Sequence, residues 1–118
     1  MNLQKAYRIA RRSDFQLVYK YGKSTANRQF VLYTLKKQEV EHFRLGISVS
    51  KKVGNAVVRN RMRRVVKEIV RSLAPQIVPH YDMVIVVRKA ALDMDFEQLR
   101  SSVIHVMRRA SMLKRERS

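Results

Sequence analysis

Residues 51–71 read KKVGNAVVRNRMRRVVKEIVR, and this stretch decides how the chain can fold. Gly54 and Asn55 end the strand pattern of the residues before them. Asn55 is a good N-cap for a helix that Pro75 would stop. Apolar residues recur at helical spacing along one side of this helix: Val58, Met62, Val65, Val66, Ile69, Val70 and Leu73. We therefore expect an amphipathic helix whose apolar side packs into a hydrophobic core.

The opposite side of this helix, with the residues just before it, is strongly basic. The stretch holds eight Lys and Arg residues against one acid, Glu68. A face that only solvates a helix normally mixes Glu with Lys at i,i+4 spacing, so the single sign of charge favours a polyanionic partner. Arg can bind two phosphate oxygens, Lys acts as a point charge, and Asn60 can bond a base edge or a 2′-hydroxyl. The candidate RNA-binding residues are Lys51, Lys52, Arg59, Asn60, Arg61, Arg63, Arg64, Lys67 and Arg71.

Three segments on either side of the helix have strand patterns. Residues 29–37 are rich in β-branched and aromatic types, residues 43–50 alternate between apolar and polar, and residues 82–88 are mostly apolar. We expect the first two to form a hairpin with one face open to solvent, and the third to take a central position. Segment 43–88 then forms a parallel strand–helix–strand unit, for which the general rule gives a right-handed crossover in about 98% of cases.

Further helices are expected near both ends of the chain. Residues 13–16 have the form of a capping box, and Gly22 can supply the left-handed residue that ends this first helix. Asp93 or Asp95 can cap a last helix. Its expected inward positions are Phe96, Leu99, Val103, Val106, Met107 and Ala110.

The order helix, strand, strand, helix, strand, helix predicts an α+β fold, a two-layer sandwich with helices packed on a small sheet. A chain of 118 residues with 46% hydrophobic residues suits a single domain with its own core. We expect residues 1–12 to form a basic arm, residues 13–113 a globular core and residues 114–118 a basic tail.

The composition limits the kinds of partner and compartment. Twenty-six basic residues against nine acids give a net charge of +17. The excess positive charges repel one another and attract nucleic acid or anionic lipid. Cysteine is absent, so disulfides and thiolate metal sites are impossible, which is compatible with a cytoplasmic location. Residues 1–12 lack the apolar run of a secretory signal, and no stretch approaches the roughly 18 apolar residues of a membrane span.

Three aromatic side chains are candidates for a surface on which the bases of an unpaired strand stack: Phe15, Tyr19 and Tyr33. They would lie beside the polar face of residues 43–50, where Arg44, Ser48 and Ser50 can bind phosphate or sugar. The competing interpretation is that these aromatics belong to the core. We assign three others to the core: Phe30, Phe43 and Phe96.

The sequence offers no recognisable catalytic or metal site. His42, His80 and His105 are isolated, and the nine acids are scattered. Residues 93–97 contain three of these acids, but a helix start explains them. Carboxylates that hold two metal ions would have to converge from several elements. We therefore expect no catalytic residue and no metal ligand in this chain.

Residues 52–64, KVGNAVVRNRMRR, resemble the signature of the bacterial ribonuclease P protein subunit. The resemblance extends to residues 13–22, 26–33 and 44–52, and it spans roughly residues 8–110. It implies a partner RNA that holds the catalytic centre. In that family the holoenzyme removes the 5′ leader of precursor tRNA with Mg²⁺ bound by the RNA, so no cofactor is expected on the protein.

The resemblance also implies residue roles. Residues 59–71 would face the catalytic RNA, and a cleft lined by Phe15, Tyr19 and Tyr33 would hold the single-stranded leader. The crossover of segment 43–88 would be left-handed, against the general rule. The chain departs from the family pattern in two places. Lys67 stands where Arg is frequent, which puts a bidentate contact in doubt, and Tyr19 replaces a frequent Phe but keeps the ring.

Other functions share some of these features. A ribosomal-type RNA-binding protein without a role in cleavage would have the same charge and fold class but would need no leader cleft. A stand-alone nuclease would cut RNA without an RNA subunit. A membrane-surface role is the weakest alternative, because the apolar side of the basic helix is needed for the core. The implied partners are the catalytic RNA and precursor tRNA, with no protein partner.

Overall fold

The protein is built around one four-stranded sheet with the strand order β1-β2-β4-β3. A computed structural model of the chain describes residues 5–115. The strands are β1 (Lys23–Ala26), β2 (Phe30–Lys36), β3 (Arg44–Val49) and β4 (Tyr81–Val87). Strand β2 pairs antiparallel with both β1 and β4, whereas β3 pairs parallel with β4.

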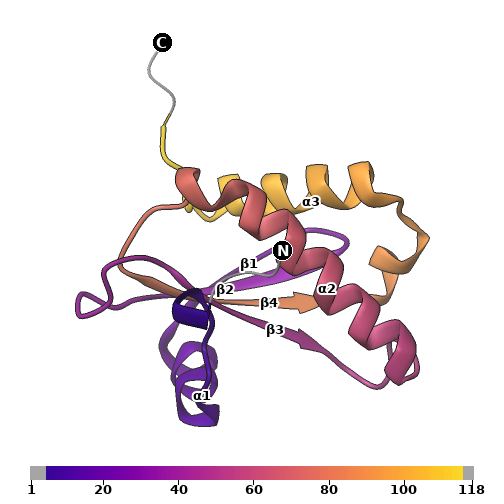
Figure 1. The fold of residues 1–118 in the computed structure, drawn as a ribbon, viewed down its shortest axis with the longest axis horizontal. Helices are drawn as coiled ribbons and strands as arrows, with labels where there is room; N and C mark the ends of the chain where they lie inside the picture. The colour runs from indigo at the N-terminus through magenta and orange to yellow at the C-terminus, as the bar shows by residue number, and fades with distance from the viewer. Residues whose placement is uncertain (1–4, 116–118) are drawn as a thin grey trace.

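Helices cover both faces of this sheet (Figure 1). Helix α1 (Arg12–Tyr21) packs on one face against β2 and β4, and α2 (Ala56–Leu73) and α3 (Phe96–Arg109) lie together on the other. Short 3₁₀ turns complete the chain: η1 (Lys5–Tyr7), η2 (Ala74–Gln76) and η3 (Lys89–Asp93). The predicted α+β class is confirmed, but the two expected layers become three because α1 takes the face opposite α2 and α3.

The strand pairing corrects the sequence-based topology. The expected hairpin of residues 29–37 with 43–50 is wrong, because β4 lies between β2 and β3. Strand β1 was not predicted, since its four residues, KSTA, are too short and too polar to show a strand pattern. The central position of β4 and the parallel β3–α2–β4 unit are confirmed. The left hand of this crossover stays a prediction drawn from the resemblance.

The main core lies between the sheet and the pair α2 and α3. The predicted apolar side of α2 supplies five buried residues: Met62, Val66, Ile69, Val70 and Leu73. They meet buried side chains of the sheet and of α3, among them Phe30, Leu32, Ile85, Val103 and Met107. Each fully buried aliphatic side chain stabilises the fold by roughly 1.5–3 kcal/mol, so this stripe anchors α2 firmly.

A smaller cluster lies under α1 on the other face of the sheet. Ile9, Val18 and Val84 are buried there, and Phe15 and Tyr33 pack against them while remaining half-exposed. The odd-numbered residues of β2 thus face α1, and the even-numbered residues face the main core, as the alternation predicts.

The ends of α1 differ from the prediction. Arg11 is the N-cap and makes no side-chain capping hydrogen bond, so the expected capping box is wrong. Gly22 is extended, with φ −76° and ψ 163°, rather than left-handed. A Cβ at Gly22 would lie 2.4 Å from the Val18 carbonyl oxygen and 2.8 Å from that of Thr34. Glycine is needed here for the close approach of α1 to β2, not for a left-handed turn.

The other two helices begin as the sequence indicates, with one exception. The Asn55 side chain accepts a hydrogen bond from the Val58 amide at 3.0 Å, and Asp95 forms a capping box with Gln98. Phe96 was assigned to the core, but it is 44% exposed. Phe96 stands on the same side of α3 as Leu99 and Val103, but as the first residue of the helix it remains exposed, so that assignment is wrong.

The expected basic arm is partly incorrect as well. Ile9 is buried and its amide donates to the Leu45 carbonyl at 2.9 Å, which places residues 8 and 9 along the outer edge of β3. The Tyr7 ring stacks on His42 with 3.9 Å between centroids. Residues 5–12 are therefore packed against the domain, and residues 1–4 of the predicted arm lie outside the described residues. Leu113, the last residue of the predicted core, forms a β-bridge with Ile77. In the predicted tail, the Lys114 amide donates to the Gln76 carbonyl, and residues 116–118 lie outside the described residues.

Candidate RNA-binding site

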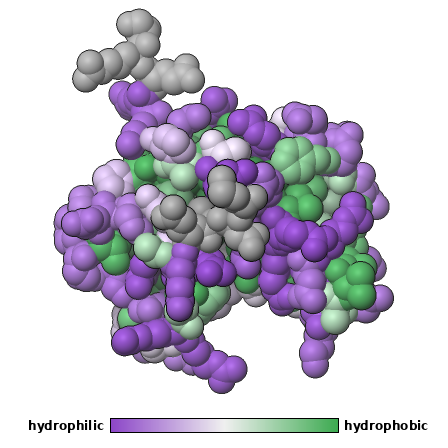
Figure 2. All heavy atoms as spheres, viewed as in Figure 1, coloured by the Kyte–Doolittle hydropathy of each residue, from purple (hydrophilic) through white to green (hydrophobic). Residues whose placement is uncertain are grey.

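The basic residues of α2 lie on the side of the helix that faces away from the core. Asn60, Arg61 and Arg64 are exposed, as are Lys51 and Lys52 before the helix. Arg59, Arg63, Lys67 and Arg71 are half-buried along the borders. Figure 2 shows that hydrophilic side chains dominate the surface on this side of the molecule. We call these nine residues the basic face: Lys51, Lys52, Arg59, Asn60, Arg61, Arg63, Arg64, Lys67 and Arg71.

Not every cation of the basic face is equally available. Arg71 donates to the Glu68 carboxylate at 2.6 Å, and this hydrogen bond lowers the pKa of Glu68. Arg63 donates to the Asn60 side-chain oxygen at 2.9 Å, and Arg59 donates to the Gly54 carbonyl at 3.0 Å. Among residues 5–115, by contrast, no other side chain accepts a hydrogen bond from Lys51, Lys52, Arg61, Arg64 or Lys67.

The aromatic candidates come together on the opposite side of the sheet. The Tyr19 and Tyr33 rings meet edge to face with 5.0 Å between centroids, and Tyr19 is 41% exposed. Phe15 lies over Gly46, where an added Cβ would come within 2.5 Å of its ring. A hollow beside these rings is lined by Ala10, Arg12, Phe15, Gln16, Tyr19 and Ser48. We call the surface formed by these residues and Tyr33 the aromatic groove. Its rings are packed on one side and open on the other, which suits stacking.

Arg44 does not join the aromatic groove. Its guanidinium donates to both carboxylate oxygens of Asp82, at 2.8 and 2.7 Å, and this hydrogen bonding raises the pKa of Arg44. Asp82 is only 1% exposed. Asp14 of α1 lies 3.7 Å from Arg44 and 3.1 Å from Lys37, so the four residues form one ion-pair cluster that ties α1 to the sheet. The donors of Arg44 serve this cluster rather than a ligand.

Ser50, the remaining predicted groove residue, also lies outside the groove. It follows the last residue of β3, is exposed, and uses its carbonyl to accept a hydrogen bond from the Val53 amide at 3.0 Å. This turn leads into α2. Ser48, by contrast, remains on the strand and lines the groove with Phe15 and Tyr19.

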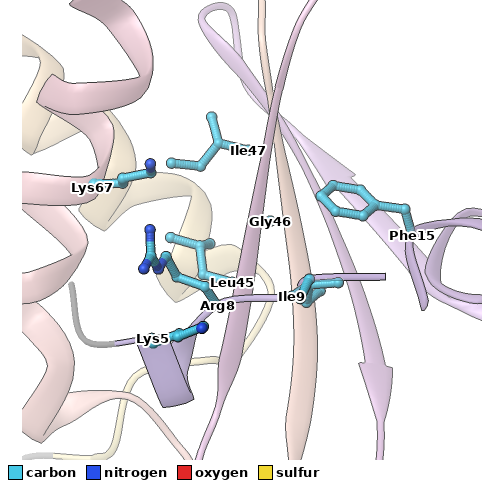
Figure 3. Close-up of a pocket in the computed structure, with 9 residues that line it drawn as sticks. Lys5, Arg8, Ile9, Phe15, Leu45, Gly46, Ile47 and Lys67 are labelled. Atoms are coloured by element: carbon cyan, nitrogen blue, oxygen red, sulfur yellow. The ribbon is translucent and has the colours of Figure 1, made fainter. Parts of the chain in front are cut away.

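The structure adds basic residues that sequence reasoning had placed elsewhere. Lys5 and Arg8, expected in a loose arm, line a second hollow together with Lys67 of α2 (Figure 3). Arg12, also expected in the arm, lines the aromatic groove. One signal was present, because Ile9 stands as an apolar residue among basic ones and could have indicated a packed segment.

Neither metal sites nor membrane spans are found in the part of the chain that the structure describes. Between residues 5 and 115, no three His, Asp or Glu side chains gather closely enough to hold a metal ion. Over the same residues, no helix is both long enough and apolar enough to cross a membrane.

Comparison with known proteins identifies the family. The family model described as Ribonuclease P matches residues 3–111. The ribonuclease P protein component of Listeria innocua is 49% identical over 97% of this chain and 96% of its own length. A mutant RNase P protein of Staphylococcus aureus has a TM-score of 0.88 at 48% identity, with 92% of each chain covered. The RNase P protein of Thermotoga maritima has a TM-score of 0.80 at 35% identity, covering 86% of this chain and 96% of that one. The chain therefore belongs to the ribonuclease P protein family, as its signature indicated, and its role is that of the RNase P protein subunit, consistent with 5′ processing of tRNA.

Proposed function

We propose that this protein is the accessory subunit of a ribonucleoprotein endonuclease that removes the 5′ leader of precursor tRNA in the cytoplasm. The protein binds the catalytic RNA through the basic face and the unpaired leader through the aromatic groove. The bond cleavage, with the Mg²⁺ that it uses, belongs to the RNA subunit, and we assign no catalytic residue or metal ligand to this chain. The observation that carries the proposal is the separation of these two surfaces on opposite faces of one sheet.

The basic face is suited to folded RNA. Arg61, Arg64 and Lys67 have donors that no described side chain occupies, so they can replace condensed counterions at phosphates. The Asn60 oxygen accepts from Arg63, which leaves the two amide N–H donors of Asn60 for a base edge or a 2′-hydroxyl. The apolar stripe of α2 is buried, and this holds the basic face rigidly toward the partner.

The aromatic groove is suited to an unpaired strand. A base that stacks on an open ring such as Tyr19 gains about 1–3 kcal/mol without dependence on its identity. Arg12 and Ser48 line the same hollow and can bind a phosphate and a sugar hydroxyl. A duplex has no unstacked bases to offer these rings, so the groove discriminates a single-stranded leader from the paired body of tRNA. A ribosomal-type RNA-binding protein would have no use for this discrimination.

The test is a processing assay with the cognate RNA subunit at low Mg²⁺. We expect the protein to stimulate cleavage of precursor tRNA, because it neutralises phosphates and adds leader contacts. Purified protein without the RNA should cut nothing. No stimulation, or metal-dependent cleavage by the protein alone, contradicts the proposal.

The groove is tested separately by Tyr33→Ala. This variant should weaken holoenzyme binding of precursor tRNA by roughly five- to a hundredfold, the range for one lost stacking contact, and leave mature tRNA binding nearly unchanged. Equal losses for both RNAs would mean that the ring serves the core instead. Crosslinks from leader nucleotides to Phe15 or Tyr33 provide an independent readout.

A further inference from the structure

The second hollow of the protein crosses the edge of β3. It shares Lys67 with the basic face and Ala10 and Phe15 with the aromatic groove, but the function described above gives the hollow itself no ligand. It has a volume of about 280 Å³ and is lined by apolar residues of β3 and the N-terminal segment together with three cations (Figure 3). The cations come from two distant parts of the chain: Lys5 and Arg8 from the N-terminal segment, and Lys67 from α2. Figure 3 shows their nitrogen atoms on the same side of β3, beside Leu45 and Ile47.

The three cations have no partner that explains why they gather. Across residues 5–115, none of them takes part in a side-chain hydrogen bond or an ion pair. Like charges brought to one site raise the free energy of the folded state unless an anion neutralises them. Lys67 is half-buried, so part of its hydration is already lost. The arrangement is therefore matched to a negatively charged ligand.

The floor of the hollow is apolar, which narrows the kind of anion. Ile9 and Leu45 are buried, Ile47 is half-buried, and the Phe15 ring closes one end across Gly46. Beyond the bridge between Arg8 and Leu45, no described strand pairs with the outer edge of β3, so peptide groups of this edge can bond a polar ring atom. A nucleotide fits the three features of this hollow: its phosphate suits the cations, its flat base suits the apolar floor, and the polar edge of the base suits the free peptide groups. The volume accommodates one nucleotide rather than a duplex.

The second hollow adjoins the aromatic groove, because Ala10 and Phe15 line both. A strand that leaves the stacking surface of Tyr19 can pass Phe15 and enter the second hollow without leaving the protein. Its far end, at Lys67, adjoins the basic face.

We propose that the second hollow binds one nucleotide of the precursor's leader, with the base on Leu45 and Ile47 and the phosphate held by Lys5, Arg8 and Lys67. The inference rests on the proposed function and extends its leader path from the aromatic groove, across the edge of β3, toward α2. The site therefore adds a phosphate clamp for the leader that is separate from aromatic stacking.

The test uses the assembled holoenzyme at saturating protein, with precursor tRNAs whose leaders are lengthened one nucleotide at a time. Arg8→Gln should weaken binding roughly three- to tenfold once the leader is long enough to reach the clamp, and not at all for shorter leaders or mature tRNA. The slope of log K against log[salt] for long leaders should become shallower by about 0.7, the value for one phosphate on a single strand. Lys36→Gln removes an exposed cation at the end of β2 and should change neither quantity.

Arg8 is exposed and outside the basic face, so Arg8→Gln reports on the clamp without loss of catalytic RNA contacts or of the fold. A weaker affinity that is equal for all leader lengths and for mature tRNA would assign these cations to another RNA surface and overturn the inference. If Tyr33→Ala abolishes leader discrimination while Arg8→Gln and Lys5→Gln leave it intact, the proposed function stands and the clamp is refuted. With 4-thiouridine placed along the leader, we expect crosslinks to residues 5–11 from a different nucleotide than those to Tyr19.

Discussion

At the scale of single residues, the cations of α2 differ in what they already bind. Arg71 is neutralised by Glu68 at 2.6 Å, and Arg63 is engaged by Asn60. Arg64 is exposed, and no described side chain accepts a hydrogen bond from it. Since RNA affinity depends on how many counterions the protein replaces, Arg64 should contribute more to binding than Arg71 does.

Arg64→Ala should therefore weaken binding to the catalytic RNA and flatten the slope of log K against log[salt] by about 0.7–0.9. The measurement is a salt titration of binding to the cognate RNA. Arg109→Ala, which removes an exposed Arg from the last turn of α3, serves as the matched control and should leave the slope unchanged. A slope that Arg64→Ala does not alter would contradict a phosphate contact at this position.

Glu68 is the one acid of α2, and we expect it to limit RNA affinity. Glu68→Gln removes the negative charge that holds Arg71, so affinity for the catalytic RNA should rise and the salt slope should steepen by up to about 0.9. Because the folded-state pKa of Glu68 is lowered by Arg71, the pair is present at neutral pH and is lost as the pH falls through that lowered pKa. Glu39→Gln makes the same charge change in the turn before β3 and should have little effect. Lower affinity of Glu68→Gln would show that the pair positions Arg71 for RNA instead.

At the scale of elements, the position of α1 determines the aromatic groove. In addition to the buried Val18, two different contacts hold this helix. The Phe15 ring occupies the space above Gly46 where a side chain would otherwise stand, and Asp14 reaches the Arg44–Asp82 pair at the start of β3. One contact is steric and the other electrostatic, so each can be removed without the other.

Gly46→Ala should push Phe15 away from β3, because the new Cβ would lie 2.5 Å from its ring. We expect the free energy of unfolding to fall by about 1–3 kcal/mol, as for other overpacked sites. The preference of the holoenzyme for precursor over mature tRNA should fall as well. Ser48→Ala, two residues further along the same face of β3, is the control. It should change the free energy of unfolding by less than about 0.5 kcal/mol in the same denaturant titration. An unchanged stability of Gly46→Ala would mean that Phe15 moves without strain.

Arg44→Ala should destabilise the fold more than any substitution on the basic face. It leaves the carboxylate of Asp82, 1% exposed, without its bidentate partner. Removal of one member of a buried pair typically costs about 3–5 kcal/mol, and we expect the low end because Lys37 remains 3.7 Å from Asp82. Arg44→Ala with Asp82→Ala should recover much of the loss in a double-mutant cycle. If both single variants unfold at the wild-type denaturant concentration, the cluster does not hold α1.

At the scale of the whole molecule, charge and fold oppose each other. A net charge of +17 on 118 residues repels itself, and the basic face concentrates that repulsion on one helix. The buried stripe of α2 offsets it, and salt or a bound polyanion should relieve it. The protein is thus expected to be least stable alone at low ionic strength and most stable within its complex.

The melting temperature of the isolated protein should accordingly rise with NaCl concentration and rise further with the cognate RNA. The double variant Arg61→Gln/Arg64→Gln should have a higher melting temperature than the wild type at low salt. In a domain of this size, a gain of about 1 kcal/mol in the free energy of unfolding raises the melting temperature by several degrees. The same variant should bind RNA more weakly. Lys89→Gln and Lys36→Gln, both exposed and outside the basic face, test whether the effect is specific to α2. A melting temperature independent of salt would contradict self-repulsion as a significant term.

Local sequence pattern was enough to determine the helices, three of the four strands and the buried stripe of α2. Asn55 caps α2, and β4 is central, as the periodicity and apolar run of residues 56–87 indicate. These features depend on residues within four positions of each other, or on the burial of a whole segment. The signature in α2 was also enough to indicate the family.

Only the tertiary structure decided which segments meet. It placed β4 between β2 and β3, turned Arg44 from a candidate ligand contact into the partner of Asp82, and brought Lys5 and Arg8 beside Lys67. Strand β1 is too short and too polar for a pattern to reveal it. In segment 5–12 the apolar Ile9 could indicate packing, but not which strand it packs against. The physical reason is that pairing, ion-pair formation and the shape of a hollow depend on contacts between residues far apart in the chain, which a periodicity read along the chain does not contain.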